Sequence, residues 1–271
     1  MPEPRFTDVR RFTSIDSTNR YLLDEARAGA PEGVVAVADH QTAGRGRLGR
    51  TWEAPAGANL LLSVLLRPEL EPAQRHLATT AVALAAVDAI DASGSVEVPG
   101  DGVGGGPVVI GIKWPNDLVA PDGRKVAGVL AEADLAPDRT MGPAPVVVGI
   151  GINVNWPAVD GDLPPELRGT AASLRELAGA ELDREALLAA LLEALGPRAA
   201  ALDTAAGRSA LAGDLRARCT TLGTTVQVTV PDGSFVGTAA AVTVDDQVAV
   251  DVDGTRRVVV AGDVMHVRPG H

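Results

Sequence analysis

Three arginines in a glycine-rich segment give the sequence its strongest chemical signal. Residues 44–50 read GRGRLGR and place Arg45, Arg47 and Arg50 within six positions. Glycine lets backbone amides approach a ligand, and guanidinium groups bind oxygen anions through forked hydrogen bonds. The same letters match the GxGxxG dinucleotide fingerprint, but no apolar helix follows them, which argues against a Rossmann fold. We expect a loop that closes over a small anion such as a phosphate or carboxylate, with a mobile surface loop as the alternative.

Lysine is rare in the chain, and both copies lie in further polar motifs. Of the 24 Lys and Arg residues only Lys113 and Lys125 are lysines. The two amino acids exchange on most surfaces, but not where a compact ammonium group is needed. The first lysine opens KWPND (113–117) at the end of an apolar strand, and the second lies in DGRKVAGVLAE (122–132), where Gly128 permits close backbone approach. A third apolar strand ends in GIGINVN (149–155). If the first two strands pair, the lysines share one region of the sheet.

Several common chemistries lack their residues. The four histidines show no metal-ligand spacing, so we expect no protein metal site, and GxSxG and P-loop motifs do not occur. The single cysteine, Cys219, permits no internal disulfide and is typical of a small buried hydrophobe. Few general bases accompany the motifs. This scarcity fits a nucleophile that is already anionic at pH 7, such as a carboxylate that attacks a phosphate.

The elements that must position these motifs follow from periodicity and turn residues. Asp16 and Ser17 can cap a helix that runs to about residue 28 and stops at Gly29. Apolar runs predict strands over 34–38, 59–66, 108–112, 125–132 and 146–154. A long buried helix is expected over 73–92, a flexible Gly-rich insertion over about 91–107, and two or three helices over 171–218, broken at Gly196-Pro197. Alternating segments over 226–230, 237–244, 248–252 and 256–260 predict a small C-terminal β-barrel, with a domain boundary near residue 218.

Composition narrows the class of protein. The chain has 271 residues, 46% of them hydrophobic and 22% charged, which is typical of a globular protein. Its formal net charge of −11 repels phosphate backbones, so we expect no nucleic-acid partner. The polar N-terminus is not a signal peptide, and the longest uncharged stretch (140–159) is interrupted by prolines and asparagines. We therefore expect a cytoplasmic protein with no membrane partner.

Five motifs in this order carry a family resemblance: DSTN (16–19), HQTAGRGRLGRTW (40–52), KWPND (113–117), GRKVAGVLAE (123–132) and GIGINVN (149–155). With a small C-terminal β domain, the chain resembles biotin protein ligases over nearly its whole length. The resemblance implies an α+β fold: a catalytic core with a mixed sheet like that of class II aminoacyl-tRNA synthetases (1–218), and an SH3-like barrel (219–271). It also implies two steps. Biotin and MgATP give biotinyl-5′-AMP and pyrophosphate, and biotin then passes to a lysine of a biotin carboxyl carrier domain.

The resemblance also implies roles for residues within the motifs. Biotin is expected to contact Ser17, Thr18, Asn19, Gln41, Gly44, Arg45, Gly46, Arg47, Trp52, Lys125 and Gly128. The nucleotide is expected to contact Arg47, Lys113, Asn116, Lys125 and Asn153. Catalysis is assigned to Lys125, Arg45, Arg47, Lys113 and Asp117, the last as a candidate acceptor or orienter for the attacking amine. Mg²⁺ is expected to arrive with ATP.

The alternatives belong to other classes. A lipoate or octanoate ligase or transferase shares the fold, a regulator could bind biotin without catalysis, and net charge disfavours a nucleic-acid-binding module. Some biotin ligases carry an N-terminal winged-helix repressor domain. Because DSTN begins at residue 16, no room is expected for one here, and we expect no repressor activity. Either a monomer or a homodimer fits the sequence.

Overall fold

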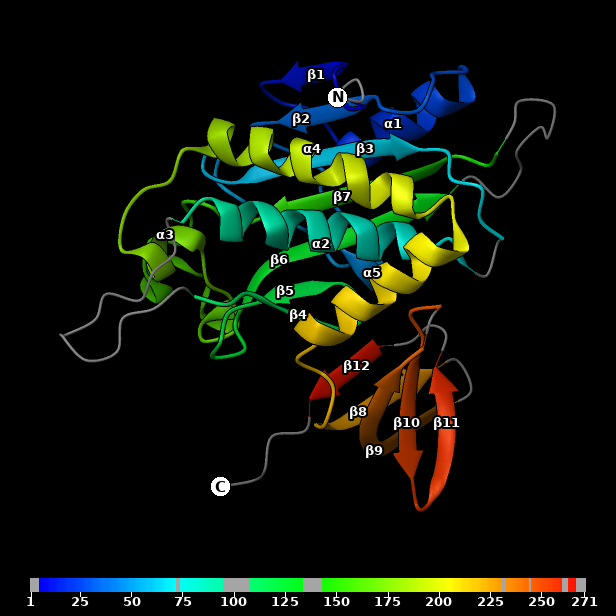
Figure 1. The fold of residues 1–271 in the computed structure, drawn as a ribbon. Helices are drawn as coiled ribbons and strands as arrows, with labels where there is room; N and C mark the ends of the chain where they lie inside the picture. The colour runs from blue at the N-terminus through cyan, green and yellow to red at the C-terminus, as the bar shows by residue number, and fades with distance from the viewer. Residues whose placement is uncertain are drawn as a thin grey trace.

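A seven-stranded mixed sheet forms the larger part of the protein (Figure 1). The computed structural model describes residues 5–71, 74–94, 108–133, 143–230, 233–243, 245–259 and 263–266. The strand order is β1-β2-β3-β7-β6-β5-β4. These strands are β1 (Val9–Phe12), β2 (Val35–Ala38), β3 (Leu60–Leu66), β4 (Gly111–Lys113), β5 (Asp117–Val119), β6 (Lys125–Ala133) and β7 (Val146–Ile152). The first pair is parallel and the others are antiparallel, which confirms the predicted α+β class.

Helices cover both faces of this sheet. On one face lies α1 (Thr18–Arg27), whose Leu22 and Ala26 pack in a small cluster with Leu65 of β3. On the other face α2 (Leu77–Ala92) packs against α4 (Arg184–Ala201) in the main core. Thirteen of the sixteen α2 residues are buried, because small alanines let the sheet and neighbouring helices approach closely. The other α-helices in the described residues are α3 (Leu174–Ala178) and α5 (Ala205–Arg218).

Local signals explain the start and end of α1. The side chain of Ser17 accepts a hydrogen bond from the Arg20 backbone amide at the N-cap. The helix ends where Gly29 takes a positive φ of 90°, a conformation that glycine adopts without a Cβ penalty. The predicted helix over 17–28 is therefore confirmed. Its capping residue belongs to the DSTN motif, so the same turn that starts the helix also fixes this polar motif beside the sheet.

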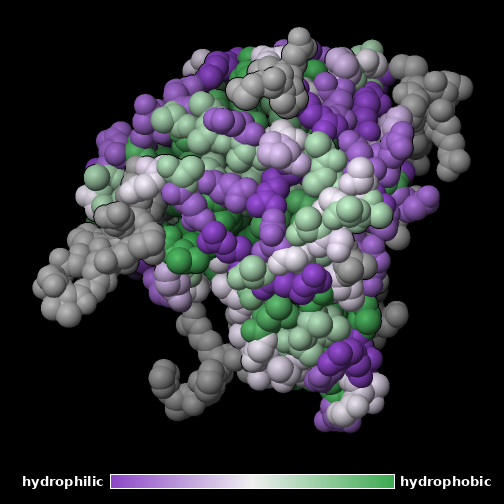
Figure 2. All heavy atoms as spheres, viewed as in Figure 1, coloured by the Kyte–Doolittle hydropathy of each residue, from purple (hydrophilic) through white to green (hydrophobic). Residues whose placement is uncertain are grey.

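The C-terminal part is a five-stranded antiparallel sheet below the main sheet in Figure 1. Its order is β11-β10-β9-β8-β12. The strands are β8 (Thr225–Val230), β9 (Gly233–Val242), β10 (Val248–Val252), β11 (Thr255–Val259) and β12 (Asp263–His266). Figure 2 shows hydrophilic and apolar side chains interspersed on this view, with apolar ones also gathered over the C-terminal sheet. The SH3-like barrel stays a prediction. No helix in the described part of the chain is long and apolar enough to cross a bilayer.

A buried carboxyl group joins the C-terminal sheet to the core. Asp246 is 3% exposed, and the Thr80 hydroxyl on α2 donates to its Oδ2. The indole Nε1 of Trp114 donates to the Asp246 carbonyl at 2.9 Å, and the His76 ring lies against the Asp245 carbonyl. Burial raises the pKa of Asp246 to about 6, against the opposing effects of Thr80 and His76. The two parts of the protein therefore meet at this desolvated acid and along one continuous hydrophobic core that includes side chains of both sheets.

The structure corrects several predicted boundaries. The expected break at Gly196-Pro197 is wrong, since α4 continues through Pro197 to Ala201. The ring of Pro197 is exposed, so the carbonyl that loses its partner lies on the solvent side, while buried Leu195 and Ala199 keep the helix packed. Residues 108–110 are not in a strand although their ends are buried, and strand β4 starts at Gly111. The long helix predicted over 73–92 is α2, which starts at Leu77.

Sequence analysis also missed three short strands, β1, β5 and β12. The predicted strand over 237–244 starts earlier, at Gly233. Most of the predicted insertion over 91–107 lies outside the described residues, and 91–92 belong to α2. Burial of Cys219 confirms it as a core side chain, and its burial raises the pKa of the thiol.

Candidate active site

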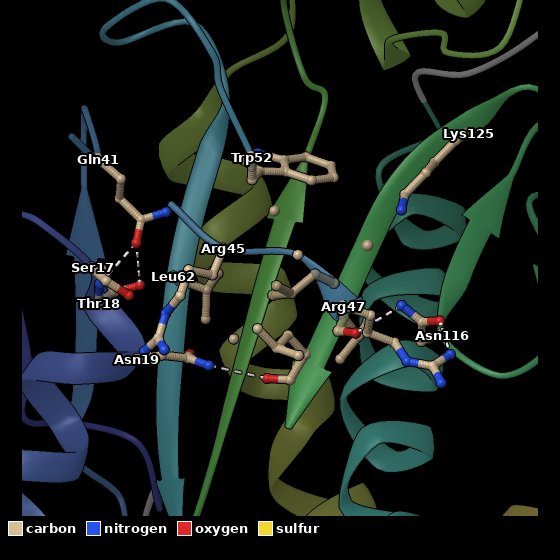
Figure 3. A pocket seen from close by; sticks show the side chains of 17 residues that line it. Ser17, Thr18, Asn19, Gln41, Arg45, Arg47, Trp52, Leu62, Asn116 and Lys125 are labelled. Atoms are coloured by element: carbon tan, nitrogen blue, oxygen red, sulfur yellow. Dashed lines mark hydrogen bonds between the residues drawn. The ribbon is translucent and has the colours of Figure 1, made fainter. Parts of the chain in front are cut away.

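One pocket on the α1 face of the sheet collects most of the predicted site residues (Figure 3). Eleven of them line it: Ser17, Thr18, Asn19, Gln41, Arg45, Gly46, Arg47, Trp52, Asn116, Lys125 and Gly128. Figure 3 shows Ser17, Thr18, Asn19 and Gln41 on one side of the pocket, Lys125, Arg47 and Asn116 on the other, and Trp52 between them. Motifs separated by more than a hundred residues meet here because β3, β7 and β6 are adjacent strands.

The polar end of the pocket is a connected hydrogen-bond network. The backbone amide and hydroxyl of Thr18 donate to Gln41 Oε1 at 2.8 and 3.0 Å. The Ser63 hydroxyl lies 2.7 Å from Thr18 Oγ1 and 2.6 Å from Asn19 Oδ1. The Asn19 amide group donates to the Leu130 carbonyl at 3.2 Å and to Glu132 Oε2 at 2.8 Å. Buried polar groups that are already paired hold one orientation, so this end can recognise a ligand with a fixed pattern of donors and acceptors.

Glycines form the floor of the pocket. A Cβ at Gly149 would lie 2.2 Å from Asn19 Oδ1, and one at Gly151 would lie 2.6 Å from the Trp52 ring. At Gly128 the nearest atoms would be Lys125 Nζ at 2.9 Å and the same ring at 3.2 Å. Real Cβ atoms do not approach other atoms this closely, so a side chain at any of these positions would push Asn19, Trp52 or Lys125 out of its present place. The floor therefore places the backbone of β6 and β7 directly against Trp52 and Asn19.

The predicted catalytic lysine lies at the cationic end. Lys125 is the first residue of β6, and its Nζ lies 2.7 Å from Asp117 Oδ1 on β5. The same ammonium lies 5.5 Å from the centroid of the Trp52 ring, within cation–π range. Both charged side chains keep some solvent contact, with 34% and 25% exposure. Asp117 therefore fixes the position of a compact cation at the mouth of the pocket.

The GRGRLGR segment (residues 44–50), here called the arginine loop, crosses the pocket between its two ends. Its backbone closes on itself, since Gly46 N–H donates to the Arg50 carbonyl at 2.7 Å and Trp52 N–H donates to the Gly44 carbonyl at 3.0 Å. Arg47 Nη1 donates to Asn116 Oδ1 at 2.9 Å, while Arg45 Nη2 lies 3.3 Å from Glu132 Oε1. Two arginines thus reach opposite walls of the pocket. The expected ordering of this loop on ligand binding stays a prediction.

Four predicted residues do not line the pocket. Asp117 acts on it through Lys125, and Gly44 packs its Cα against the Trp52 carbonyl. Asn153 is 7% exposed and bonds to Asn59 and to the Lys125 and Ala172 carbonyls, which fixes the chain after β7. Lys113 lies opposite Asp117 in the β4–β5 register. The nucleotide roles of Lys113 and Asn153 stay predictions.

Sequence reasoning missed the apolar lining residues Leu62, Val129, Leu130 and Ile150, and four further residues of the site. Ser63 is the only polar residue in β3 (LLLSVLL), and Glu132 is the only acid in β6 (KVAGVLAEA), so each carried a weak signal. Gly149 and Gly151 belong to the GIGINVN motif but were not assigned to a site. Among the described residues no group of three or more His, Cys, Asp or Glu side chains could hold a metal ion.

Comparison with known proteins defines the class to which this fold and pocket belong. The model of the family described as "Biotin/lipoate A/B protein ligase family" matches residues 11–153 of this chain. A biotin–[acetyl-CoA-carboxylase] ligase of Mycobacterium tuberculosis is 39% identical over 255 residues, covering 93% of this chain and 86% of the relative. The chain belongs to the biotin/lipoate A/B protein ligase family. The bifunctional ligase/repressor BirA of Bacillus subtilis is 35% identical, and this chain spans 49% of its length.

A solved structure has the same architecture. The biotin protein ligase from Aquifex aeolicus in complex with biotin and ATP has a TM-score of 0.75 and 25% identity, with 97% of this chain and 100% of that chain covered. The match includes the C-terminal sheet as well as the mixed sheet, because nearly the whole of both chains is aligned.

Proposed function

We propose that this protein is an ATP-dependent biotin protein ligase, a biotin–[biotin carboxyl-carrier protein] ligase. The observation that carries the proposal is the pairing of two unlike ends in one pocket, a preformed hydrogen-bond network around Thr18 and Asn19 and a cationic end with Lys125 and Arg47. Relatives named biotin–[acetyl-CoA-carboxylase] ligase support the same activity.

The polar end favours biotin over lipoate or octanoate. The ureido ring of biotin presents two N–H donors and a carbonyl acceptor, whereas a dithiolane or an alkyl chain presents no such groups. Binding a chain without them would bury the hydrogen-bonding capacity that the protein network leaves at this end without a ligand partner, at about 1–3 kcal/mol for each unpaired group.

The cationic end would activate the carboxylate of biotin. This carboxylate and the phosphates of ATP repel each other, so cations fixed in advance are needed to bring them into line. Lys125, held by Asp117, would lie between the attacking carboxylate oxygen and the α-phosphate. The carboxylate oxygen attacks the α-phosphorus, the bond to the β-phosphate oxygen breaks, and pyrophosphate leaves. Arg45 and Arg47 would close the loop over the adenylate and keep water from the mixed anhydride.

Transfer to the carrier follows from the same geometry. A neutral lysine amine of the carrier domain attacks the carbonyl carbon, the bond to AMP breaks, and the amine loses a proton. Asp117 is our candidate for orienting that amine or accepting its proton. ATP would bring Mg²⁺ as part of the substrate, coordinated by its phosphate oxygens. Asn116 and Lys113 are assigned to the nucleotide side. We expect the reaction in the cytoplasm, by a monomer or homodimer, without nucleic-acid or membrane partners.

Exchange of labelled pyrophosphate into ATP tests the proposal. Exchange that depends on biotin, and does not occur with lipoate or octanoate, is expected. Biotin transfer to a purified carrier domain with MgATP then tests the second step. Exchange with lipoate instead would establish the alternative activity, and biotin binding without any exchange would indicate a non-catalytic regulator.

A further inference from the structure

Glu132 contacts both the polar end of the pocket and the arginine loop. It lies near the end of β6, where its side chain is 23% exposed. Its Oε2 accepts a hydrogen bond from Asn19 Nδ2 at 2.8 Å, and its Oε1 lies 3.3 Å from Arg45 Nη2. Each oxygen of one carboxylate therefore holds a different part of the site.

The first contact sets the orientation of the Asn19 amide. Its nitrogen faces two acceptors, Glu132 Oε2 and the Leu130 carbonyl, while its oxygen lies 2.6 Å from the Ser63 hydroxyl. A carboxylate can only accept hydrogen bonds, so a flipped amide would place two oxygen atoms against each other. Gly149 leaves the room that the amide needs, because a Cβ there would overlap Asn19 Oδ1.

The second contact holds the near side of the arginine loop. Arg45 bridges to Thr51 through the backbone, so the loop segment moves with it. On the far side, Arg47 donates to Asn116 Oδ1. The loop thus spans the pocket between a charged contact on β6 and a neutral amide contact after β4. The contact at Glu132 is shared with Asn19, a residue of the polar end.

We propose that Glu132 is a positioning residue that couples ring recognition at Asn19 to closure of the arginine loop. This inference rests on the proposed function. A ligand that occupies the polar end immobilises Asn19 and with it the carboxylate, which then lies where Arg45 reaches it when the loop closes. Closure in turn keeps the carboxylate in place for Asn19. The two events stabilise each other, so release of biotinyl-AMP requires both contacts to be lost.

Two variants separate the contacts. In E132Q the side-chain oxygen still accepts from Asn19, but the charge that attracts Arg45 is gone. We expect biotinyl-AMP to dissociate about three- to tenfold faster than from the wild type, the range for a partly exposed ion pair. Amide exchange over 44–50 in the liganded protein should rise with it. E132A loses both contacts and should in addition weaken biotin binding about tenfold or more. E185Q is the matched control, since Glu185 forms a partly exposed ion pair with Arg11 and lines neither the pocket nor the cavity beside Arg45 and Glu132.

A double-variant comparison distinguishes positioning from a general structural role. If Glu132 acts through Arg45, the E132Q change should not accelerate adenylate release further in an R45A background. Additive effects in the double variant, or wild-type release and exchange in E132Q, would overturn the inference. If E132A does not fold, E132Q still provides the test, because its shape matches glutamate. Failure of the wild type to catalyse biotin-dependent pyrophosphate exchange would instead overturn the proposed function, so the two failures are distinguishable.

Discussion

Replacing Asp246 with asparagine should stabilise the protein at neutral pH. The carboxyl group is almost completely buried between the C-terminal sheet and α2, with the Thr80 hydroxyl on one oxygen. In the described residues, Oδ1 has no hydrogen-bond partner. Asparagine has the same shape, its oxygen can still accept from Thr80, and it tolerates the positive φ of 57° at this position. The substitution therefore removes a buried charge while it retains the packing.

The raised pKa gives the size and the pH window of the effect. Folding takes the carboxyl pKa from 3.8 to about 6, because burial disfavours the charged form. Below pH 4 the carboxyl group is neutral in the folded state, and the stability of the wild type is at its full value. As the pH rises through 6 the buried group ionises, and this part of the stability is lost. At pH 7 to 8 the D246N protein should be more stable than the wild type by about 1–3 kcal/mol. The difference should shrink steadily between pH 6 and pH 4.

Urea unfolding at pH 4.5, 5, 6, 7 and 8 measures this difference directly. The matched control is D253N, since Asp253 is exposed and also has a positive φ of 47°. The control should show any gain from asparagine in this conformation without the dependence on pH. The groups around Asp246 include His76 and Thr80 of the α2 region, Trp114 and the Cys219 thiol, with Arg75, Arg47 and Glu132 across the neighbouring cavity. A D246N protein that is less stable than wild type at pH 8, by a margin that grows with pH, would refute the reasoning.

Three further predictions concern the pocket and its support. Lys125→Arg should lower the adenylation rate, and Lys125→Ala should lower it by about 10²–10³-fold. The free energy of unfolding should change by less than about 1 kcal/mol in both variants, because the ion pair with Asp117 is partly exposed. An arginine variant with the wild-type rate would contradict this prediction. Arg47→Ala should speed adenylate release and change the free energy of unfolding by less than about 0.5 kcal/mol. A large fall in melting temperature with a normal release rate would instead show that the loop stabilises the fold. Deletion of 220–271 should impair both half-reactions and stability, because it exposes the Trp114 side chain; a folded truncation with wild-type rates would refute the coupling.

The main elements of the fold were predictable because they depend on local pattern. The runs that become β3, β6 and β7 are apolar and bounded by turn residues, and Ser17 with Gly29 marks both ends of α1. The short strand β1 was not predicted because its sequence VRRF shows no clear alternation of apolar and polar residues. Its parallel pairing with β2 is a property of the assembled sheet. The continuation of α4 through Pro197 depends on buried neighbours that the sequence does not identify.

The site was predictable where motifs are compact and not where partners are distant. Thr18, Gln41 and Lys125 stood in motifs and do line one pocket. Ser63 and Glu132 serve the same network, but their roles depend on cross-strand neighbours such as Asn19. The sequence offered only a polar residue inside each apolar strand. Tertiary position, and not residue type, decides that these two side chains contact the polar residues of the pocket.

The glycine floor has a consequence for how this gene tolerates mutation. Gly149 and Gly151 already have the smallest side chain available, so every substitution there adds a Cβ in the space of Asn19 or Trp52. Either neighbour is a side chain that can turn aside, which would leave a folded protein with a blocked pocket. A saturation library scored for cellular abundance should therefore accept some changes at these codons, whereas one scored for activity should accept none. Codons that separate the two scores in this way would outline the pocket without any ligand.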